Sequence, residues 1–600
     1  MLLLGFGLCA TTALALAQRW APTDTPRDRW LAAAVLLPTV GITSLRVLGG
    51  LGWLQGFQVL LWLAALAVLA VVGWRPKAVA WRPPLGIGAG FLPLGLSAAA
   101  LGVALVAARV LPVWQWDALG YHLPFVAHAL QAGSLAGVPW DAPYLGTYPH
   151  GVELWDLGAR ALLSDDRWLD AAELPLCVTG AVATAGLSRR AGATPPVAVG
   201  FGALWLTLPA VFLQLPSAYL DVVAASFLLL ALYWLLAPPS LAATVLCALS
   251  LGLYLDSKPT ALLPTAVLGA VLGLRCWRAG QQRTIFLAAG VVLVLGSETY
   301  LMNTLHHGNP LWPIRLSLGR WTLSGKHTLT DVLSSGAKAP HLSGPLPWRI
   351  WKAWIAFNPL PTFDMRTGGF GPLFTYLALP VAALGVLRRR GLWLLLLGIP
   401  LLTADPAIAR YTLAFPAVCL ALAAAELSRF SPLGAGRSAL PGARFWQPSG
   451  LALATGLAAL GLWLALPGLT DNQHTLRELW ARNRQAREAL LLPSTSAPAW
   501  AAFRAGLPRE ATVATDDSFD LRYLLWRPDL GNRVELLPPD VQGDALLSWL
   551  DGRGVRFVVA SREASVGTLA AAHPERLRPL FPCGASDPTC AVWWLRPKDL

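Results

Sequence analysis

Charged residues are scarce in this chain of 600 amino acids. Asp, Glu, Lys and Arg together make up 13% of the sequence, whereas soluble globular domains carry roughly 25%. The deficit excludes an ordinary soluble fold, because most of the surface must then face something other than water. Hydrophobic residues make up 55%, and apolar runs of about 20 residues, long enough to cross a bilayer core, recur along the chain. We therefore predict a mainly α, polytopic transmembrane helical bundle.

Long blocks of like charge are also missing. The formal net charge is +13, which would suit a nucleic-acid partner if the basic residues formed a block or a mixed basic and aromatic surface. They form neither, and basic residues of membrane proteins normally gather in cytoplasmic loops. We therefore expect a lipid bilayer, and no nucleic acid, among the partners.

The apolar runs predict about fourteen membrane spans. We place them near residues 2–17, 30–48, 54–74, 86–112, 169–188, 195–214, 219–236, 241–255, 260–274, 284–301, 371–387, 391–404, 409–426 and 450–467. The first run could also be a signal peptide. It lacks a basic start and further spans follow it directly, so we interpret it as the first span.

Basic residues alternate between the connections of these spans. One set of connections contains Arg19, Arg27, Arg29, Arg75, Lys77, Arg82, Arg189, Arg190, Arg275, Arg278, Arg283, Arg388, Arg389, Arg390, Arg429, Arg437 and Arg444. The short connections on the other face have almost none, and only residues 237–240 on the basic side carry no charge. The positive-inside rule then puts the basic connections in the cytoplasm and both termini on the outer face.

Three segments of the outer face are too long to be simple connections. Residues 113–168 and 302–370 are rich in Trp, Tyr, Pro and Gly, as expected for interfacial helices and binding loops. The third segment opens with a charged amphipathic stretch at 471–490 that predicts one helix. Strand-like runs at 511–515 and 555–561 then enclose a helical segment, which predicts a small C-terminal α/β domain outside the membrane.

Cysteine is sparse as well. Five of the seven cysteines lie in or at the ends of apolar spans, where a thiol behaves as a small hydrophobic group. The other two, Cys583 and Cys590, bracket a turn in the outer domain, and an oxidising compartment would favour a disulfide between them. A zinc site there would lack further Cys or His ligands, so no metal ligands are assigned.

Polar residues stand at the outer ends of several apolar spans, where ionisable groups are costly to bury and are candidates for function. They are Asp117, Tyr121, His122, Asp221, Asp256, Lys258, His306, His307, Asn309, Arg410 and Tyr411. The predicted topology puts all of them on one face, so they could converge on one cavity.

Each of these residues also has an ordinary structural interpretation. Asp221 could cap a helix N-terminus, and Asp256 could form a local ion pair with Lys258. Arg410 could reach toward lipid headgroups, and the neighbouring histidines could be solvated in a turn. Asp117 could be an interfacial residue that starts a loop helix.

A cavity with these groups would suit transfer from a lipid phosphate. A carboxylate can take the proton of an incoming hydroxyl, while Lys and Arg can neutralise a phosphate, Arg with two parallel hydrogen bonds. An apolar groove between spans would hold a polyprenyl chain, and interfacial aromatic rings would stack on a sugar.

The segment WDALGYHLPFVAHALQAGSL (116–135) resembles the first outer loop of the GT-C superfamily of polyprenyl-phosphate-sugar-dependent glycosyltransferases, in particular the protein mannosyltransferase and aminoarabinose transferase group. In that group an acid after an early span is followed by Tyr, His and a helix that ends in Gly. Similar segments follow in the usual order: TYPHGVELW (147–155), AYLDVVAASFLLLAL (218–232), GLYLDSKPTALL (252–263), GNPLWP (308–313), GGFGPLF (368–374) and ARYTLAFP (409–416). The outer α/β tail is also similar to tails of bacterial members.

The resemblance implies an inverting glycosyltransferase of the bacterial plasma (inner) membrane. It would move a sugar from a polyprenyl-phosphate donor to an extracytoplasmic glycan, lipid or protein acceptor. Asp117 would be the catalytic base, Lys258 and Arg410 would bind the phosphate, and Asp221 would be a second acidic site. The other donor- or substrate-binding candidates are Tyr121, His122, His307, Asn309 and Tyr411.

The chain departs from the GT-C pattern in two places. Many members carry two adjacent acids in the first loop, whereas Ala118 follows Asp117 here. This departure argues against a metal ion bridged by adjacent carboxylates and leaves open whether a divalent ion assists; no other cofactor is expected. Three spans precede the usual first one. The chain then divides into additional N-terminal transmembrane helices (1–85), a GT-C-like transmembrane catalytic module (86–467) and the extracytoplasmic α/β domain (468–600).

The alternative function is a transporter or flippase for a lipid-linked or hydrophobic solute. Transporters are often built from two repeated halves, with broken helices near the middle of the membrane. The sequence shows no such repeat, and its polar residues stand at one face rather than in mid-span. Glycosyl transfer is therefore the prediction.

Overall fold

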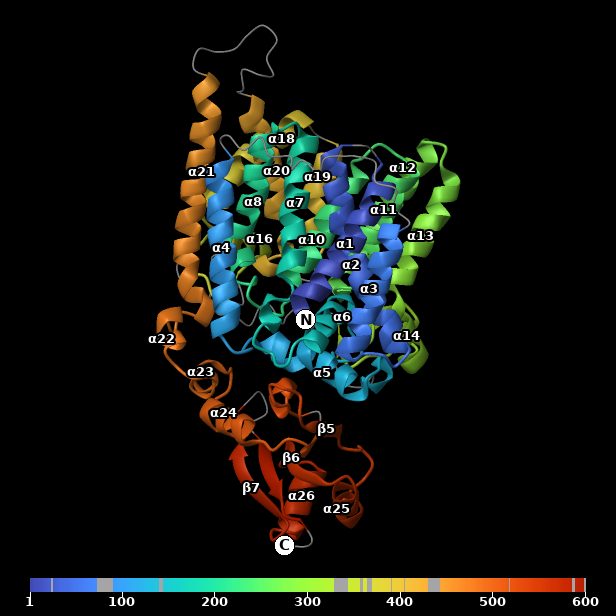
Figure 1. Cartoon of the computed structure of the whole chain (residues 1–600), viewed down its shortest axis with the longest axis vertical. Coiled ribbons are helices and arrows are strands. Elements are labelled where there is room, and N and C mark those ends of the chain that lie inside the picture. Colours follow the sequence, from blue (N-terminus) through green and yellow to red (C-terminus); the bar gives the residue numbers. More distant parts are fainter. Residues whose placement is uncertain are drawn as a thin grey trace.

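The apolar segments fold into a bundle of helices in the computed structural model (Figure 1). The structure describes residues 1–22, 25–72, 90–139, 144–328, 344–356, 360–363, 369–389, 391–403, 405–429, 443–516, 518–584 and 589–597. Five basic residues used for the topology prediction lie outside the described residues: Arg75, Lys77, Arg82, Arg390 and Arg437.

The bundle is built from helices that stand side by side. They are α1 (Leu2–Trp20), α2 (Pro26–Gly50), α3 (Gly56–Val72), α4 (Phe91–Val110), α7 (Leu174–Ala191), α8 (Pro195–Leu204), α10 (Asp221–Leu235), α11 (Leu241–Leu255), α12 (Leu262–Arg278), α13 (Gln282–Gly296), α18 (Leu379–Arg389), α19 (Leu392–Gly398), α20 (Ala414–Arg429) and α21 (Ala443–Ala465). The prediction of a polytopic, mainly α membrane protein is confirmed.

The exact number of membrane crossings is not fixed by the helices. Within the described ranges, seven helices are long and apolar enough to cross a membrane, and the pair of α13 and α14 (Glu298–His307), bent by 65°, makes an eighth. Helices such as α10 and α11 have only 15 residues each. A helix accompanies each predicted run, but fourteen complete crossings stay a prediction.

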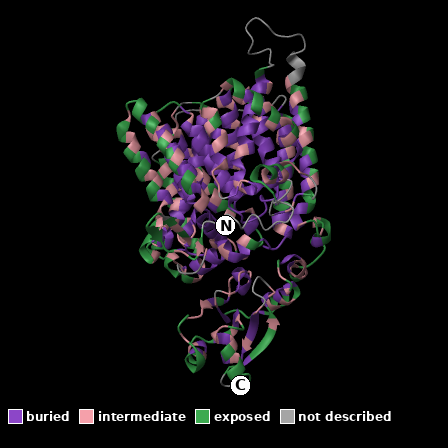
Figure 2. Cartoon of the chain, turned by 180° about the vertical axis from the view of Figure 1, so that it is seen from behind, coloured by how far each residue is buried: buried purple, intermediate pink, exposed green. Residues whose placement is uncertain are grey.

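Burial separates the central helices from the peripheral ones. All residues of α10 are buried, and its sequence is apolar nearly all round, with Asp221 and Ser226 as the main polar residues, as expected for a helix enclosed by others. In α4 and α21 only about one residue in three is buried in the apolar stretch. Figure 2 shows the same gradient from a buried interior to an exposed rim. The rim helices thus present apolar side chains to lipid.

The C-terminal tail forms the predicted α/β domain. Its five strands are β4 (Thr512–Thr515), β5 (Arg533–Leu536), β6 (Val555–Ser561), β7 (Leu577–Pro582) and β8 (Cys590–Leu595), in the order β5-β4-β6-β8-β7. β4 is parallel to both β5 and β6, and α25 (Gly543–Gly552) connects β5 to β6, whereas β8 is antiparallel to both β6 and β7. Cys583 and Cys590, which follow β7 and open β8, are joined by a disulfide.

The charged stretch at 471–490 is not the single helix that its pattern predicts. It folds into two short helices, α22 (Leu476–Trp480) and α23 (Arg484–Leu491). Asn483 separates them, because its side chain accepts a hydrogen bond from the backbone of Ala486 and so starts a new helix.

The outer segment 113–168 lies between the bundle and the C-terminal sheet (Figure 1). It contains the π-helical turn η1 (Ala118–His122), α5 (Leu123–Ala132) and α6 (Gly151–Leu162). We call this end of the bundle the sheet end. The second long segment contributes a small sheet of β1 (Ile314–Leu318), β2 (Trp321–Leu323) and β3 (His327–Thr328).

The tail rests directly on the outer segment. Its turn η12 (Arg522–Leu525) packs against η1. The side-chain amide of Gln131 exchanges two hydrogen bonds with the backbone of Val534 in the edge strand β5, at 3.1 and 3.0 Å. Gly120 lies so close that a Cβ atom there would be 3.1 Å from the carbonyl oxygen of Asp520. The tail therefore helps to position the residues around η1.

Candidate functional site

Asp117 stands at the sheet end of the bundle, immediately before the π-helical turn η1. Single π-helical turns contain one extra residue and are frequent at functional sites. The backbone N–H of Asp117 donates a hydrogen bond to the hydroxyl oxygen of Tyr219, at 3.1 Å. Its carboxylate side chain is 18% exposed. Asp117 is thus held by its backbone while its side chain keeps access to solvent.

A chain of contacts leads from Asp117 to two cations and a second carboxylate. Arg410, in η10 (Ala409–Thr412), places its Nη1 atom 2.9 Å from Asp117 Oδ2 and 3.4 Å from Asp221 Oδ2. The other carboxylate oxygen of Asp221 is bonded by Lys258, which lies between α11 and α12. Residues far apart in the sequence therefore form a row of alternating charge, Asp117–Arg410–Asp221–Lys258, which we call the charge row.

These contacts decide between the interpretations that the sequence leaves open. Asp221 is the first residue of α10 and its carboxylate bonds the two cations. Arg410 is only 7% exposed, so it does not extend to lipid headgroups. Lys258 pairs with Asp221 rather than with Asp256, whose carboxylate instead lies 2.6 Å from Arg46 of α2.

Aromatic rings support both cations of the charge row. The guanidinium carbon of Arg410 lies 4.9 Å from the ring centroid of Tyr219 and 5.1 Å from that of Tyr411. Lys258 Nζ is 5.3 Å from the ring of Tyr411. Cations over an aromatic face are stabilised by the ring's negative face. Tyr411 thus contributes to the site through its ring.

Three further tyrosines gather beside Asp117. The ring centroid of Tyr121 lies 6.0 Å from those of both Tyr144 and Tyr148. Burial, followed by the nearby charge of Asp117, raises the pKa of Tyr121 well above its ordinary value. The hydroxyl therefore stays protonated and can donate a hydrogen bond.

His122 is buried next to Tyr121 and is oriented by a carboxylate. Its Nδ1 atom lies 2.7 Å from Oε1 of Glu153 in α6, and its ring contacts that of Tyr121 with centroids 4.2 Å apart. A buried histidine held in this way keeps its neighbour in place. Glu153 thus joins the set of residues that shape the site.

The electrostatics of the site keep Asp117 ionised. Burial alone would raise the pKa of its carboxyl group, but the charges of Arg410, His122 and Lys258 and the hydrogen bond from Arg410 outweigh it. The pKa of Asp117 therefore lies below its ordinary value. The carboxylate can take a proton readily only if Arg410 is drawn away from it.

Three of the four residues of the charge row form the polar end of a narrow groove, and Asp117 lies next to it through its contact with Arg410. A cavity of about 30 Å³ is lined at one end by Asp221, Lys258, Arg410 and Tyr411. The remaining lining residues are mainly apolar and come from α10, α11, the start of α20 and the turns before α12 and α20 and after α19: Ala224, Ala225, Leu228, Tyr254, Thr260, Pro400, Leu413 and Ala414. The volume is that of about two water molecules, and the lining joins a cationic end to apolar walls, the chemical character that an anionic head followed by an apolar chain would need.

Two of the predicted binding residues stabilise the second outer segment (302–370) instead. Asn309 is fully buried, and its side-chain amide donates to the carbonyl oxygens of Ile314 and Ser324, both at 2.8 Å. The ring of His307 stacks on that of Trp312, with centroids 4.3 Å apart. These contacts stabilise the loop that leads into β1. The structure does not place either residue in the lining of the groove.

Sequence reasoning missed Arg46, Glu153 and Tyr219 as parts of the site region. Arg46 lies inside a predicted span, and an ionisable residue within an apolar run is a signal that could have found it. Its guanidinium pairs with Asp256 and, at 2.5 Å, with Glu298. It thereby fixes the loop that carries Lys258.

A divalent metal ion does not fit between the two acids of the charge row. Asp117 and Asp221 both contact Arg410, so a metal bridging them would have to displace this cation. In the part of the chain that the structure describes, no group of three or more His, Cys, Asp or Glu side chains is arranged to hold a metal ion. Asp117 and Asp221 are therefore neutralised by Arg410 and Lys258 rather than by a metal ion.

Comparisons with known proteins give remote similarities. No protein-family model and no curated protein matches the sequence. Among solved structures, the chain is similar to ArnT from Cupriavidus metallidurans bound to undecaprenyl phosphate, with a TM-score of 0.46 and 14% identity over 83% of this chain and 97% of that one. The apo state of the same protein gives a TM-score of 0.46 and 15% identity over the same shares.

A third solved structure is the apo form of the oligosaccharyltransferase from Archaeoglobus fulgidus. Its TM-score is 0.36 and its identity 14%, over 78% of this chain and 70% of that one. At such low TM-scores these three structures carry no argument about function, so the functional assignment rests on the residues of the site.

Proposed function

We propose that this protein is a GT-C-type membrane glycosyltransferase that moves a sugar from a polyprenyl-phosphate donor to an extracytoplasmic acceptor. The observation that carries the proposal is the charge row at the head of an apolar groove. Guanidinium and ammonium groups bind phosphate, and the apolar walls match a polyprenyl chain. Asp117 stands at one end of the row, and its side chain is 18% exposed, so an acceptor hydroxyl can reach it.

Donor binding exchanges the partners of the two cations. Within the protein, Arg410 and Lys258 are balanced by Asp117 and Asp221. A phosphate diester that enters the groove offers Arg410 a new anionic partner. Arg410 then loosens its hold on Asp117, and burial of the carboxyl group raises its affinity for a proton.

The chemical step then needs one base and one leaving group. Asp117 takes the proton of the acceptor hydroxyl while the hydroxyl oxygen attacks the anomeric carbon of the sugar. The bond between that carbon and the phosphate oxygen breaks, and its electron pair leaves with the phosphate, which Lys258 and Arg410 stabilise. A single displacement of this kind inverts the configuration at the anomeric carbon.

Replacement of the base tests the proposal. Asp117→Asn keeps the size of the side chain but cannot accept the proton, so we expect transfer to fall by about a hundredfold or more. Full-length protein in membranes is given a panel of undecaprenyl-phosphate-linked hexoses and pentoses, and products are measured by mass spectrometry. Asp544→Asn, an exposed change in the tail with a side chain 89% accessible, is the control. Transfer by Asp117→Asn within tenfold of wild type would remove Asp117 from the base role.

Donor binding is tested separately with undecaprenyl phosphate. We expect Lys258→Ala and Arg410→Ala to weaken its binding, as measured by native mass spectrometry of the purified full-length protein. Unchanged binding in both variants would undo the phosphate assignment. If wild-type protein transfers no sugar but moves the lipid-linked sugar across a vesicle membrane, the transporter alternative would hold instead.

A further inference from the structure

A second cavity lies away from the charge row, where α4 meets the tail. It has a volume of about 220 Å³, far above the roughly 10–15 Å³ that one water molecule requires. Four arginines line it together with one acid and the end of α4: Arg109, Arg167, Arg484, Arg487, Asp166, Val110, Leu111 and Pro112. We call it the arginine cavity. It shares no lining residue with the groove of the charge row.

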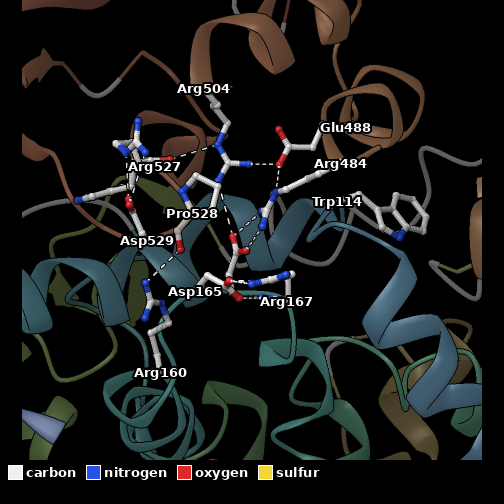
Figure 3. A network of polar contacts seen from close by, with 12 residues as sticks. Trp114, Arg160, Asp165, Arg167, Arg484, Glu488, Arg504, Arg527, Pro528 and Asp529 are labelled. Atoms are coloured by element: carbon white, nitrogen blue, oxygen red, sulfur yellow. Dashed lines mark hydrogen bonds and ion pairs between the residues drawn. The ribbon is translucent and has the colours of Figure 1, made fainter. Parts of the chain in front are cut away.

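Two of the four arginines are neutralised within the protein. Arg484 Nη1 lies 2.6 Å from Asp166 Oδ1, and its Nε atom lies 2.9 Å from Glu488. Arg167 bonds the neighbouring carboxylate of Asp165, with Nε to Oδ2 at 2.7 Å. Figure 3 shows these side chains converging beside Arg504 of the tail.

The other two arginines have no carboxylate partner among the described residues. Arg487 donates three hydrogen bonds, all to backbone carbonyl oxygens of Val110, Leu479 and Trp480. Arg109 lies over the ring of Trp168, 5.9 Å from its centroid, and makes no hydrogen bond or ion pair within the described ranges. Burial and the nearby charges of Arg109 and Arg484 lower the pKa of Arg487. The cavity thus holds two cations that the protein leaves uncompensated.

The surroundings of the cavity place it at the level of lipid headgroups. Arg109 is in the last turn of α4, an apolar helix long enough to span a membrane. Trp168 and Trp480 beside the two cations are 40% and 61% exposed, and Trp is enriched where membrane meets water. Exposed Leu105 and Val106 continue along α4 toward the bilayer.

We propose that the arginine cavity binds the phosphate of an anionic phospholipid of the outer leaflet, through Arg109 and Arg487. Guanidinium groups match phosphate with paired hydrogen bonds. Val110, Leu111 and the exposed face of α4 lie where the glycerol and acyl chains would follow. A lipid bound there bridges α4 and α23 and so fixes the tail at the membrane surface.

Lipid retention by the full-length protein tests this site. Wild type and variants are purified in parallel from mixed micelles of phosphatidylglycerol and phosphatidylcholine, and bound lipids are counted by native mass spectrometry. We expect wild type to retain phosphatidylglycerol selectively and Arg109→Gln to bind it about tenfold more weakly, which corresponds to about 1.4 kcal/mol. Arg109 makes no hydrogen bond within the described chain, so its loss leaves the fold intact. Arg487→Gln is the second variant, and its folding is checked by thermal melting.

Arg482→Gln is the matched control, because Arg482 is exposed in the same stretch of the tail and does not line the cavity. It removes the same charge and should retain the lipid as wild type does. Equal retention of phosphatidylglycerol by wild type, Arg109→Gln and Arg487→Gln would overturn the proposal. Retention of as much phosphatidylcholine as phosphatidylglycerol by wild type would overturn it too. Inorganic phosphate that raises the melting temperature of wild type as much as the lipid does would assign the cavity to a free anion and overturn the lipid source.

The lipid site can be separated from the proposed glycosyl transfer. Arg109→Gln should bind undecaprenyl phosphate as wild type does, because the groove of the charge row is untouched. Lys258→Ala should keep the phosphatidylglycerol. Loss of both lipids in both variants would indicate a single shared site and contradict the arginine cavity as a separate one.

Discussion

Arg410 controls the proton affinity of the proposed base. Its ion pair is the largest of the influences that hold the pKa of Asp117 down against burial. In Arg410→Gln the pKa of Asp117 should rise, so the carboxylate would become protonated at a higher pH. We expect the low-pH limb of the kcat/KM profile, where activity is lost on acidification, to move to higher pH. Lys258→Gln should move it less, because Lys258 contributes least; an unmoved limb in Arg410→Gln would refute the assignment.

Tyr219 has two separable roles beside Asp117. Its hydroxyl accepts the backbone N–H of Asp117, and its ring lies under Arg410. Tyr219→Phe keeps the ring but leaves a buried N–H unpaired, at a cost of about 1–3 kcal/mol. We expect kcat to fall while the affinity for undecaprenyl phosphate is preserved. Tyr219→Leu should lower both kcat and the affinity for undecaprenyl phosphate. An equal loss of affinity in Tyr219→Phe and Tyr219→Leu would show that the hydroxyl, not the ring, holds Arg410.

At the scale of elements, the start of α6 fits tightly against the loop that carries Lys258. A Cβ atom at Gly151 would lie 2.4 Å from Asp256 Oδ2, and the N–H of Gly151 donates to the carbonyl oxygen of Asp256 at 2.7 Å. Gly151→Ala should therefore displace this loop, cost about 1–3 kcal/mol of stability and weaken binding of undecaprenyl phosphate.

Gly269→Ala is the control for that change. Gly269 lies inside α12 and has nothing within 4 Å of an added Cβ, so alanine should be neutral or slightly stabilising there. Thermal melting and lipid binding are measured on both variants. A Gly151→Ala protein with wild-type melting and binding would show that the loop has room to move.

Elements were predictable from the sequence where their pattern was local. Apolar runs near 20 residues and the strand–helix–strand pattern around 543–552 indicated the bundle and the tail, and both are found. β5, β7 and β8 were not predicted; β5, for example, has the residues RVEL and forms a short edge strand with no strong apolar pattern. The break between α22 and α23 was missed because amphipathic periodicity continues through a capping asparagine.

At the scale of the whole molecule, the sequence indicated which polar residues share a face but not which ones touch. Arg410 meets Asp117 across 293 positions and Asp221 across 189. No local pattern encodes such distances, because they depend on how the helices pack. For the same reason the sequence left the partner of Asp256 open between Lys258 and no partner, whereas the structure pairs it with Arg46, 210 positions away.

The predicted topology remains open to a direct experiment. Reporter fusions after residues 435 and 560 of the full-length chain should lie on opposite sides of the membrane, because one span, α21, separates the two positions. A reporter that is active only in the cytoplasm should work at 435 and fail at 560. Activity at both positions would rule out the fourteen-span arrangement.

If the proposed glycosyl transfer takes place, the balance of the charge row affects how the spent carrier leaves the protein. Two carboxylates offset two cations within the row, and the donor brings one negative charge as a phosphate diester. In the proposed reaction, Asp117 ends protonated while the spent carrier is a phosphate monoester with a charge of about −1.5 to −2. The site then matches its product better than its substrate. We therefore expect undecaprenyl phosphate to act as a product inhibitor. We also expect release of the spent carrier to be the rate-limiting step of turnover.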